Sequence, residues 1–407
     1  MAVYLDHNAT TPMRPQAVAA MVEAMHVVGN ASSVHGFGRA ARARVDGARR
    51  QVAALVGGAA ANVVFTSGGT EANNLALRGC GRRRVLVSAI EHDSVLGAIE
   101  DAERIPVDAH GVVDLAALER TLAASTEPAI VAVMLANNET GVIQPVAEVV
   151  RIAHRHGALV ACDAVQAAGK IALDMAALGV DYLSLSAHKL GGPQGAGALV
   201  LRDGAPLSAV QTGGGQERGR RGGTENVAGV VGFGAAVEIA GRELDAFARL
   251  AALRDRVQAA LDGARVLGAD APRLPNTLNV AMPGVPAQTQ IMALDLAGIA
   301  VSAGSACSSG KVKASPVLRA MGVAEADAGS ALRISFGWNS TEDDAARMIA
   351  AWMDVYRRLA SPSPRLRAEG RGKGAPQVGY GRGAPLDTAP HPNPIPAGGD
   401  RERKTAA

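Results

Sequence analysis

The sequence is poor in aromatic residues and in cysteine. Phe, Trp and Tyr together make up 3% of its 407 residues, so we do not expect the aromatic platforms on which proteins stack nucleic-acid bases. The three cysteines, Cys80, Cys162 and Cys307, show no paired spacing. This argues against a disulfide framework and against a metal site made of cysteines alone, and we expect no metal. Any cysteine with a chemical role therefore acts singly.

Long apolar runs are also absent. The longest extends from Val227 to Val237, contains three glycines and ends at Glu238, whereas a membrane-spanning helix needs roughly 20 apolar residues. The N-terminus, Met-Ala-Val-Tyr-Leu-Asp, has neither the basic region nor the apolar run of a secretory signal. We therefore predict a cytoplasmic protein that does not associate with membranes.

The remaining composition is that of a globular protein followed by a polar tail. Hydrophobic residues make up 48% of the sequence and charged residues 19%, which suffices for a core, and the length favours two domains. Residues 361–407 hold 8 Pro, 8 Gly, and 8 Lys and Arg against 4 Asp and Glu, so the net charge of +3 arises there. Such a segment buries too little apolar surface to fold. We predict a disordered tail, either simply solvated or a weak tether to an anionic partner.

Short apolar runs alternate with helical patterns over residues 62–202. This alternation is typical of an α/β fold, in which helices cover a mainly parallel sheet whose strand ends gather binding groups. After about Leu250 the pattern changes, which indicates a second, smaller α+β domain. The predicted strands of the sheet are Asn62–Thr66, Arg84–Ser88, Ala129–Leu135, Ala158–Cys162, Asp181–Leu185 and Ala198–Leu201. Predicted in the second domain are a helix near Glu243–Leu261, a strand at Thr277–Met282, a helix near Gln288–Leu296 and a final helix after Thr341.

The turn after the first predicted strand suits an anion. It reads Thr66-Ser67-Gly68-Gly69-Thr70-Glu71-Ala72-Asn73-Asn74 and opens a helix. Backbone N–H groups at a helix N-terminus, with glycines and a hydroxyl beside them, can hold a phosphate. The pattern also fits an ordinary strand-to-helix turn capped by Thr70. It lacks the spacing of a dinucleotide fingerprint and the Gly-Lys of a P-loop.

Two further turns supply a carboxylate and an amine. Asp163 follows an apolar strand, where it could pair with a protonated heteroaromatic nitrogen or cap a helix. Lys189 lies among small residues in the turn 185–193, where it is either a surface charge or a desolvated amine suited to Schiff-base chemistry. A phosphate cradle, an aspartate and a lysine at the strand ends of one sheet match the needs of pyridoxal 5'-phosphate. We therefore predict this cofactor, with Lys189 forming the Schiff base.

At this point the sequence resembles the class V aminotransferase group of fold-type I pyridoxal phosphate enzymes, and within it the cysteine desulfurases of the NifS/IscS type. The resemblance runs from Tyr4 to about Arg358. It implies a large cofactor-binding domain over 15–245 with a mainly parallel seven-stranded sheet, a small α+β domain over 246–360, and an N-terminal segment, 1–14, packed on the small domain. The motifs that carry it are 4–12, 30–35, 88–92, 137–141, 221–224 and 304–310.

The resemblance also implies roles for single residues. His92 would stack on the cofactor ring and serve as acid/base, although it could simply cap a helix. Asn138 and Gln166 would touch the edge of the ring. Arg333, together with Asn138, would bind the substrate carboxylate, although it could be a charge on a strand face. The residues expected around the phosphate are Gly69, Thr70, Ser186 and His188, with Thr224 reaching it from the other subunit of a homodimer.

Cys307 distinguishes the desulfurases from their aminotransferase relatives. It lies in the stretch 304–310, which has no core-forming side chain and is followed by Lys311 and Lys313. Nearby positive charge favours a thiolate. Cys162, within an apolar strand, instead fits inert packing, and Cys80 is expected to be incidental. The resemblance implies that Cys307 is the catalytic sulfur acceptor.

The activity implied is that of a cysteine desulfurase, a sulfurtransferase of EC class 2.8.1. It would convert L-cysteine to L-alanine, with Lys189 moving the Cα proton, and leave a persulfide on Cys307 for an acceptor scaffold protein of iron–sulfur cluster assembly or a related sulfur transfer. The alternatives are a selenocysteine lyase or small amino acid aminotransferase, and a non-catalytic sulfur-assembly scaffold. The arginines at 218, 220 and 221 do not indicate nucleic-acid binding, because aromatics and a basic body are lacking.

Overall fold

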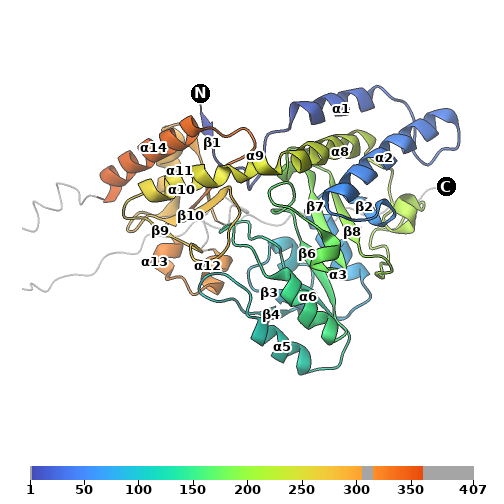
Figure 1. Ribbon diagram of the computed structural model, residues 1–407, viewed down its shortest axis with the longest axis horizontal. Helices are drawn as coiled ribbons and strands as arrows, with labels where there is room; N and C mark the ends of the chain where they lie inside the picture. Colours follow the sequence, from blue (N-terminus) through green and yellow to red (C-terminus); the bar gives the residue numbers. More distant parts are fainter. Residues whose placement is uncertain (1, 305–314, 361–407) are drawn as a thin grey trace, which may run out of the picture. The chain divides into compact units, whose positions relative to one another are not determined.

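Seven strands form the larger sheet of the computed structural model, which describes residues 2–304 and 315–360 (Figure 1). They are β2 (Val63–Thr66), β3 (Arg84–Ser88), β4 (Glu103–Ile105), β5 (Ala129–Ala132), β6 (Leu159–Asp163), β7 (Tyr182–Ser186) and β8 (Gly197–Leu201). Their order is β2-β8-β7-β6-β5-β3-β4. β8 is antiparallel to both its neighbours, and the other four pairs are parallel. The predicted mainly parallel, seven-stranded sheet is confirmed.

The sequence did not reveal every boundary of this sheet. β4 was missed because it is a short edge strand in which Glu103 and Arg104 are exposed and only Ile105 is buried. The strand predicted to reach Leu135 ends at Ala132. Residues 133–135 stay buried and still pair with β6, since the backbone N–H of Leu135 donates to the carbonyl of Asp163 at 2.9 Å. The apolar pattern of these residues is therefore the same as that of a strand, which is why the sequence placed the end of the strand too late.

Helices cover both faces of the large sheet. Alternate side chains of β3 enter different hydrophobic clusters: Leu86 packs on the side of α2, α6 and α8, and Val85 and Val87 pack on the side of α3 and α4. Strands buried on both faces are apolar throughout, which made them recognisable in the sequence. The helices are α1 (Pro15–Met25), α2 (Gly36–Leu55), α3 (Gly69–Gly79), α4 (Asp93–Leu96), α5 (Leu115–Ala123), α6 (Val146–Arg155), α7 (Met175–Leu178) and α8 (Val227–Arg242), with short 3₁₀ turns η1 (Ala60–Asn62), η2 (Ala187–Lys189) and η3 (Gln216–Gly219).

Glycines allow α8 to fit between α1 and α2 (Figure 1). A Cβ atom at Gly234 would lie 2.8 Å from Cα of Ala48, and one at Gly232 would lie 2.4 Å from Cγ of Met21. Contacts this close are sterically forbidden. The glycines that interrupt the longest apolar run of the sequence therefore serve helix packing.

A second, antiparallel sheet has the order β12-β13-β10-β9, and β1 pairs with β11 in parallel. The strands are β1 (Val3–Tyr4), β9 (Arg265–Val266), β10 (Thr277–Ala281), β11 (Ile299–Ala300), β12 (Ser302–Ala303) and β13 (Ala331–Ser335). Val3 and Leu5 share a hydrophobic cluster with this sheet and with α9 (Leu244–Ala248), α10 (Leu250–Ala260), α11 (Ala287–Leu296) and α14 (Glu342–Ala360). The short helices α12 (Pro316–Ala320) and α13 (Glu325–Ala328) pack in a separate, smaller cluster. Because residues up to 361 form one compact unit, the domain boundary near 245 stays a prediction.

The helix predicted near 243–261 is two helices, α9 and α10, separated at Arg249. The backbone N–H of Ala252 donates to the carbonyl of Arg249, three residues back instead of four. This tight turn interrupts the helix although no proline or glycine is present, so the sequence pattern did not indicate the break.

Two predictions fall outside the described residues, namely the tail 361–407 and the position of Cys307. Across 2–304 and 315–360, none of the helices combines the length and apolar character needed to cross a membrane.

Trp352 tests the packing of the second hydrophobic cluster. Its side chain is fully buried and stacks on Tyr356 with 4.9 Å between the ring centroids. Trp352→Ala should lower the free energy of unfolding by about 3–5 kcal/mol in urea denaturation, because it leaves a large cavity. Leu359→Ala, at a position on the same helix that is 41% exposed, is the control and should change stability little. Equal effects of the two variants would contradict this packing.

Candidate active site

A cavity of about 780 Å³ lies where the carboxyl ends of the large sheet's parallel strands meet β13. Every predicted site residue among the described ones lines it, except Thr224. Thr224 is exposed and does not line it, and Cys307 lies outside the described residues. The predicted residues that the fold brings together here are Gly69, Thr70, His92, Asn138, Asp163, Gln166, Ser186, His188, Lys189 and Arg333. Their roles stay predictions.

Asp163 is the last residue of β6, and its carboxylate is fixed by two hydrogen bonds. Its Oδ2 accepts from Nδ2 of Asn73 at 2.7 Å, and its Oδ1 accepts from the backbone N–H of Val165 at 2.9 Å. Asn73 comes from α3 and also donates to Ser94 at 2.9 Å. The carboxylate is therefore held at the strand end in one orientation.

Lys189 ends the 3₁₀ turn that follows β7. Its Nζ donates to the carbonyl of Asn8 at 2.5 Å and to the carbonyl of Ala9 at 2.8 Å. Both carbonyls belong to the N-terminal segment, which passes across the cavity wall. The amine is thus directed at the cavity and held there by backbone.

The turn between β2 and α3 forms the predicted anion site. Gly68 precedes the helix without a side-chain cap, so N–H groups of the first turn face the open end. A Cβ at Gly69 would lie 2.7 Å from Cγ2 of Val165, which explains the glycine. Thr70, Ser186 and His188 line the same hollow. This arrangement can bind a phosphate through backbone and hydroxyl donors.

His188 contributes to this hollow as a neutral group. Burial, together with the charge of Lys189, lowers the pKa of His188 to about 4. Its Nδ1 lies 3.2 Å from Oγ1 of Thr10. A neutral imidazole still has one N–H to donate to an anion.

The arginines of the glycine-rich loop are engaged within the protein. Arg221 pairs with Glu71 in the first turn of α3 at 2.7 Å, and Arg218 and Arg220 both donate to the carbonyl of Ala61. Arg221 therefore offsets a carboxylate beside the anion site. These contacts also tie the loop that carries Thr224 to α3 and η1.

Arg333 lies beside Asn138 and also contacts Asp6. Nη1 of Arg333 donates to the carbonyl of Asn138 at 3.0 Å, and Nη2 donates to Oδ1 of Asp6 at 2.7 Å. Nε of Arg333 and Oδ1 of Asn138 are buried without a hydrogen-bond partner. Both residues line the cavity, so these two atoms are available to a ligand there.

His92 caps α4, which was the alternative to a role at the cofactor, and it also lines the cavity, so its role there stays a prediction. Its Nδ1 accepts from the backbone N–H of Ser94 at 3.1 Å. An accepting Nδ1 places the proton of a neutral ring on Nε2. Nε2 is therefore the atom through which His92 can donate a proton.

Several polar residues of the site were not given roles from the sequence. Asn8, Asn73 and Glu91 belong to motifs already described, and each could have been found as a polar residue close to the end of a buried strand. Lys170 stood in no motif, and Asp6 and Arg333 are too far apart in the chain to be paired by pattern. Glu139 is buried as well, and burial raises its pKa while Ser315 donates to its Oε2 at 2.5 Å.

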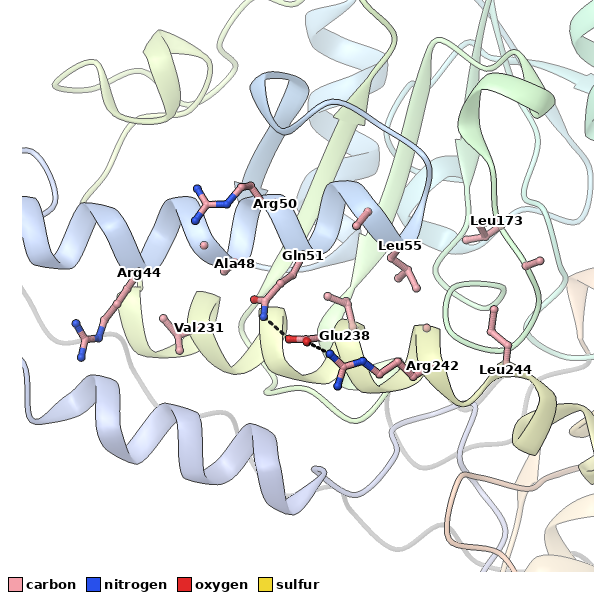
Figure 2. Close-up of a pocket in the computed structure, with 15 residues that line it drawn as sticks. Arg44, Ala48, Arg50, Gln51, Leu55, Leu173, Val231, Glu238, Arg242 and Leu244 are labelled. Carbon is pink, nitrogen blue, oxygen red and sulfur yellow. Dashed lines mark hydrogen bonds and ion pairs between the residues drawn. The ribbon is translucent and has the colours of Figure 1, made fainter.

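A second hollow of about 760 Å³ lies between α2 and α8 (Figure 2). Gln51 of α2 contacts Glu238 of α8 across it, Arg242 pairs with Glu238 on the same helix, and Arg44 and Arg50 also line it. None of the predicted site residues lines it. Among the described residues, no group of three or more His, Cys, Asp or Glu side chains could hold a metal. The chemistry-bearing residues thus gather in the first cavity.

Glu91 gives this cavity a testable pH dependence. Its Oε1 accepts from Oγ of Ser88 at 2.6 Å and from the N–H of Met134 at 2.7 Å. Burial, with a smaller effect of the Asp163 charge, raises the pKa of Glu91 from 4.5 to about 8. Between these values the unfolded chain releases a proton that the folded protein retains, so Glu91 makes stability fall as pH rises and has no further effect above pH 8.

Glu91→Gln should reduce this fall between pH 5 and pH 8 by at least about 1.4 kcal/mol, the equivalent of one pKa unit. Urea denaturation of both proteins across this range measures the difference. Parallel stability curves would show that Glu91 is ionised in the folded protein.

Known proteins show the same organisation. Residues 3–348 match the family model described as aminotransferase class-V. A cysteine desulfurase of Gluconacetobacter diazotrophicus is 43% identical over 383 residues, which cover 89% of this chain and 95% of that protein. An IscS-like cysteine desulfurase of Mycobacterium tuberculosis is 41% identical over 364 residues, covering 84% of this chain and 93% of that protein.

The fold is also similar to that of a solved structure. The NifS-like protein from Rickettsia africae superimposes with a TM-score of 0.82 at 34% identity, covering 88% of this chain and all of that one. The predicted fold class and the predicted family are both confirmed. The chain belongs to the class-V aminotransferase family and, within it, to the cysteine desulfurases.

Proposed function

We propose that this chain is a pyridoxal phosphate-dependent cysteine desulfurase, a sulfurtransferase that converts L-cysteine to L-alanine and retains the sulfur as a persulfide. The observation that carries the proposal is the convergence of Lys189, Asp163 and an anion site in one cavity of about 780 Å³. The relatives named above as cysteine desulfurases support it.

The residues around the cavity fit the cofactor. The N-terminus of α3 and the hydroxyls of Thr70 and Ser186 would hold the phosphate, in a cradle where a Cβ at Gly69 would collide with Val165. Oδ1 of Asn138 is buried without a partner and could accept a hydrogen bond from a bound ligand. Asp163 would face the ring nitrogen, and Lys189 would carry the aldehyde carbon. When bound, pyridoxal phosphate supplies an electron sink for negative charge at the substrate Cα.

The chain's own groups then bind substrate and move protons. Arg333 would bind the substrate carboxylate, which replaces or joins Asp6 as its anionic partner. Nζ of Lys189 would remove the Cα proton, since it is already held at the cavity by two carbonyls. Asp163, oriented by Asn73, keeps a negative charge where the ring nitrogen must stay protonated. Nε2 of His92 is the remaining proton donor.

Cys307 is the proposed sulfur acceptor. Its thiolate would attack the substrate sulfur, and the bond between Cβ and sulfur would break. Cβ would take up the proton of the substrate thiol, and Cα would regain its own proton, which completes L-alanine. The two described cysteines suit this role poorly. Both Cys80 and Cys162 are buried, and burial raises the pKa of each thiol, so the nucleophilic thiolate is disfavoured.

We propose a homodimer with the second subunit packed against α1 and the start of α2. Exposed large apolar side chains are concentrated there, namely Val18, Val22, Met25, Val28, Val34 and Phe37. A concentration of exposed apolar side chains along one part of the chain favours an interface there. Thr224, exposed and outside its own cavity, would then serve the other subunit. The persulfide would pass to an acceptor protein of iron–sulfur cluster assembly or a related sulfur transfer.

Lys189→Ala tests the cofactor assignment. The variant should lose L-alanine formation from L-cysteine by about 10²–10⁴-fold, because the proton acceptor at Cα is gone. It should also lose the visible absorption band that a lysine-bound pyridoxal phosphate gives. The fold should persist, since Lys189 lies in a turn and contributes nothing to the hydrophobic clusters. Retention of normal turnover would contradict the mechanism.

Cys307→Ser tests the sulfur acceptor. The variant should still bind pyridoxal phosphate and L-cysteine, but sulfur transfer should stop, because a hydroxyl is far less nucleophilic than a thiolate near neutral pH. Peptide mass spectrometry of the unmodified protein after incubation with L-cysteine should find the additional sulfur at Cys307. Cys80→Ser and Cys162→Ser are the controls and should retain activity. Full desulfuration by Cys307→Ser, or extra sulfur on another cysteine, would overturn the assignment.

The same assay separates the alternatives. A selenocysteine lyase would release L-alanine from selenocysteine and not from L-cysteine, whereas an aminotransferase would need a keto acid and leave the sulfur in place. A non-catalytic scaffold would show no visible absorption band with pyridoxal phosphate.

A further inference from the structure

Lys170 is a buried amine that the mechanism above does not use. It lies in the turn after β6 and is 3% exposed. Its Nζ donates to Oδ1 of Asn8 and to Oε1 of Gln166, both at 2.9 Å. Both acceptors are neutral amides, and among the described residues no carboxylate forms an ion pair with it. Burying an amine without an anion is costly, so a packing role alone would be met better by methionine.

The surroundings add to this cost. Burial lowers the pKa of Lys170 well below its usual value, and the charges of Lys189 and Arg333 lower it further. His7, on the other side, has its pKa lowered to about 4 by burial and by the charge of Lys170. The amine is thus retained where electrostatics oppose it, which points to the two hydrogen bonds as its purpose.

A lysine amine that donates both of its bonds determines the orientation of each amide it touches. Gln166 must turn Oε1 toward Lys170, which leaves Nε2 on the opposite side, where it donates to the carbonyl of Asn8 at 3.0 Å. One hydrogen of Nε2 is used in that bond, and the other remains beside the cavity that Gln166 lines. Without Lys170, only the bond to the carbonyl of Asn8 would distinguish the two orientations of this amide.

Asn8 is oriented in the same way. Its Oδ1 also accepts from Asn276 at 3.1 Å, and its Nδ2 donates to Oγ1 of Thr277 at 2.9 Å. The carbonyl of Asn8 accepts from Nζ of Lys189 at 2.5 Å. Lys170 itself does not line the main cavity, so any effect on it passes through these two residues.

We propose that Lys170 is a positioning residue, which fixes Gln166 with its N–H donors toward the cavity and holds the side chain of Asn8, the residue whose carbonyl accepts from Lys189. The proposal rests on the proposed function, because it concerns the site that would bind pyridoxal phosphate. It assigns Lys170 no contact with substrate or cofactor.

The test measures pyridoxal phosphate binding to Lys170→Met, Gln166→Ala and the double variant. Lys170→Met alone should raise the dissociation constant roughly threefold to tenfold, as expected for the loss of one hydrogen bond, and shift the visible band. In the Gln166→Ala background the same substitution should change the dissociation constant less than twofold, because the effect passes largely through Gln166. Lys170→Gln, which keeps a donor, should recover part of the loss.

Ile171→Val is the matched control. Ile171 is the neighbouring residue and packs on the core of the large sheet, so this variant should lower the unfolding temperature without changing cofactor binding. If Lys170→Met does not fold, Lys170→Gln and Gln166→Ala complete the same cycle. Equal effects of the Lys170 substitution in both backgrounds, or a change in stability alone, would refute the positioning role. Absence of a visible band in the unmodified protein would instead refute the proposed function.

Discussion

The cavity depends on one residue that joins the two sheets, Asn8. Its carbonyl holds the amine of Lys189 and the amide of Gln166, both of which follow strands of the large sheet. Its side chain donates to Thr277 on β10 of the second sheet and to the carbonyl of Asn138. The N-terminal segment is therefore part of the site, because it links the strand ends that supply the amine to the strands that supply Arg333.

Burial determines the charge states around this junction. Carboxyl groups such as Glu91 and Glu139 have raised pKa values, and amine and imidazole groups such as Lys170 and His188 have lowered ones. All four shifts favour the neutral form, as expected when charges leave water. Arg333 instead forms an ion pair with Asp6 at 2.7 Å. This guanidinium suits the proposed binding of a substrate carboxylate.

Much of this arrangement could be predicted from the sequence, for physical reasons. The strands of the large sheet are buried on both faces, so they form apolar runs, and their ends are marked by polar residues such as Asp163 and Lys189. β4 was not predicted, because an exposed edge strand has no such apolar run. The hydrogen-bond partners of the site residues were not predicted for another reason. The bonds from Asn73 to Asp163 and from Arg333 to Asp6 join residues 90 and 327 positions apart, and only tertiary packing decides them. The roles of the site residues and the domain boundaries remain predictions.

We propose that Lys189, and no other lysine, carries pyridoxal phosphate. Lys170 is the main alternative, since both lysines line one small hollow. Reduction of the cofactor-loaded protein with borohydride makes the carbon–nitrogen link permanent, and peptide mass spectrometry then locates it. We expect the phosphopyridoxyl group on the peptide that contains Lys189. Its presence on Lys170 or on any other lysine, or its absence from every peptide, would contradict this assignment.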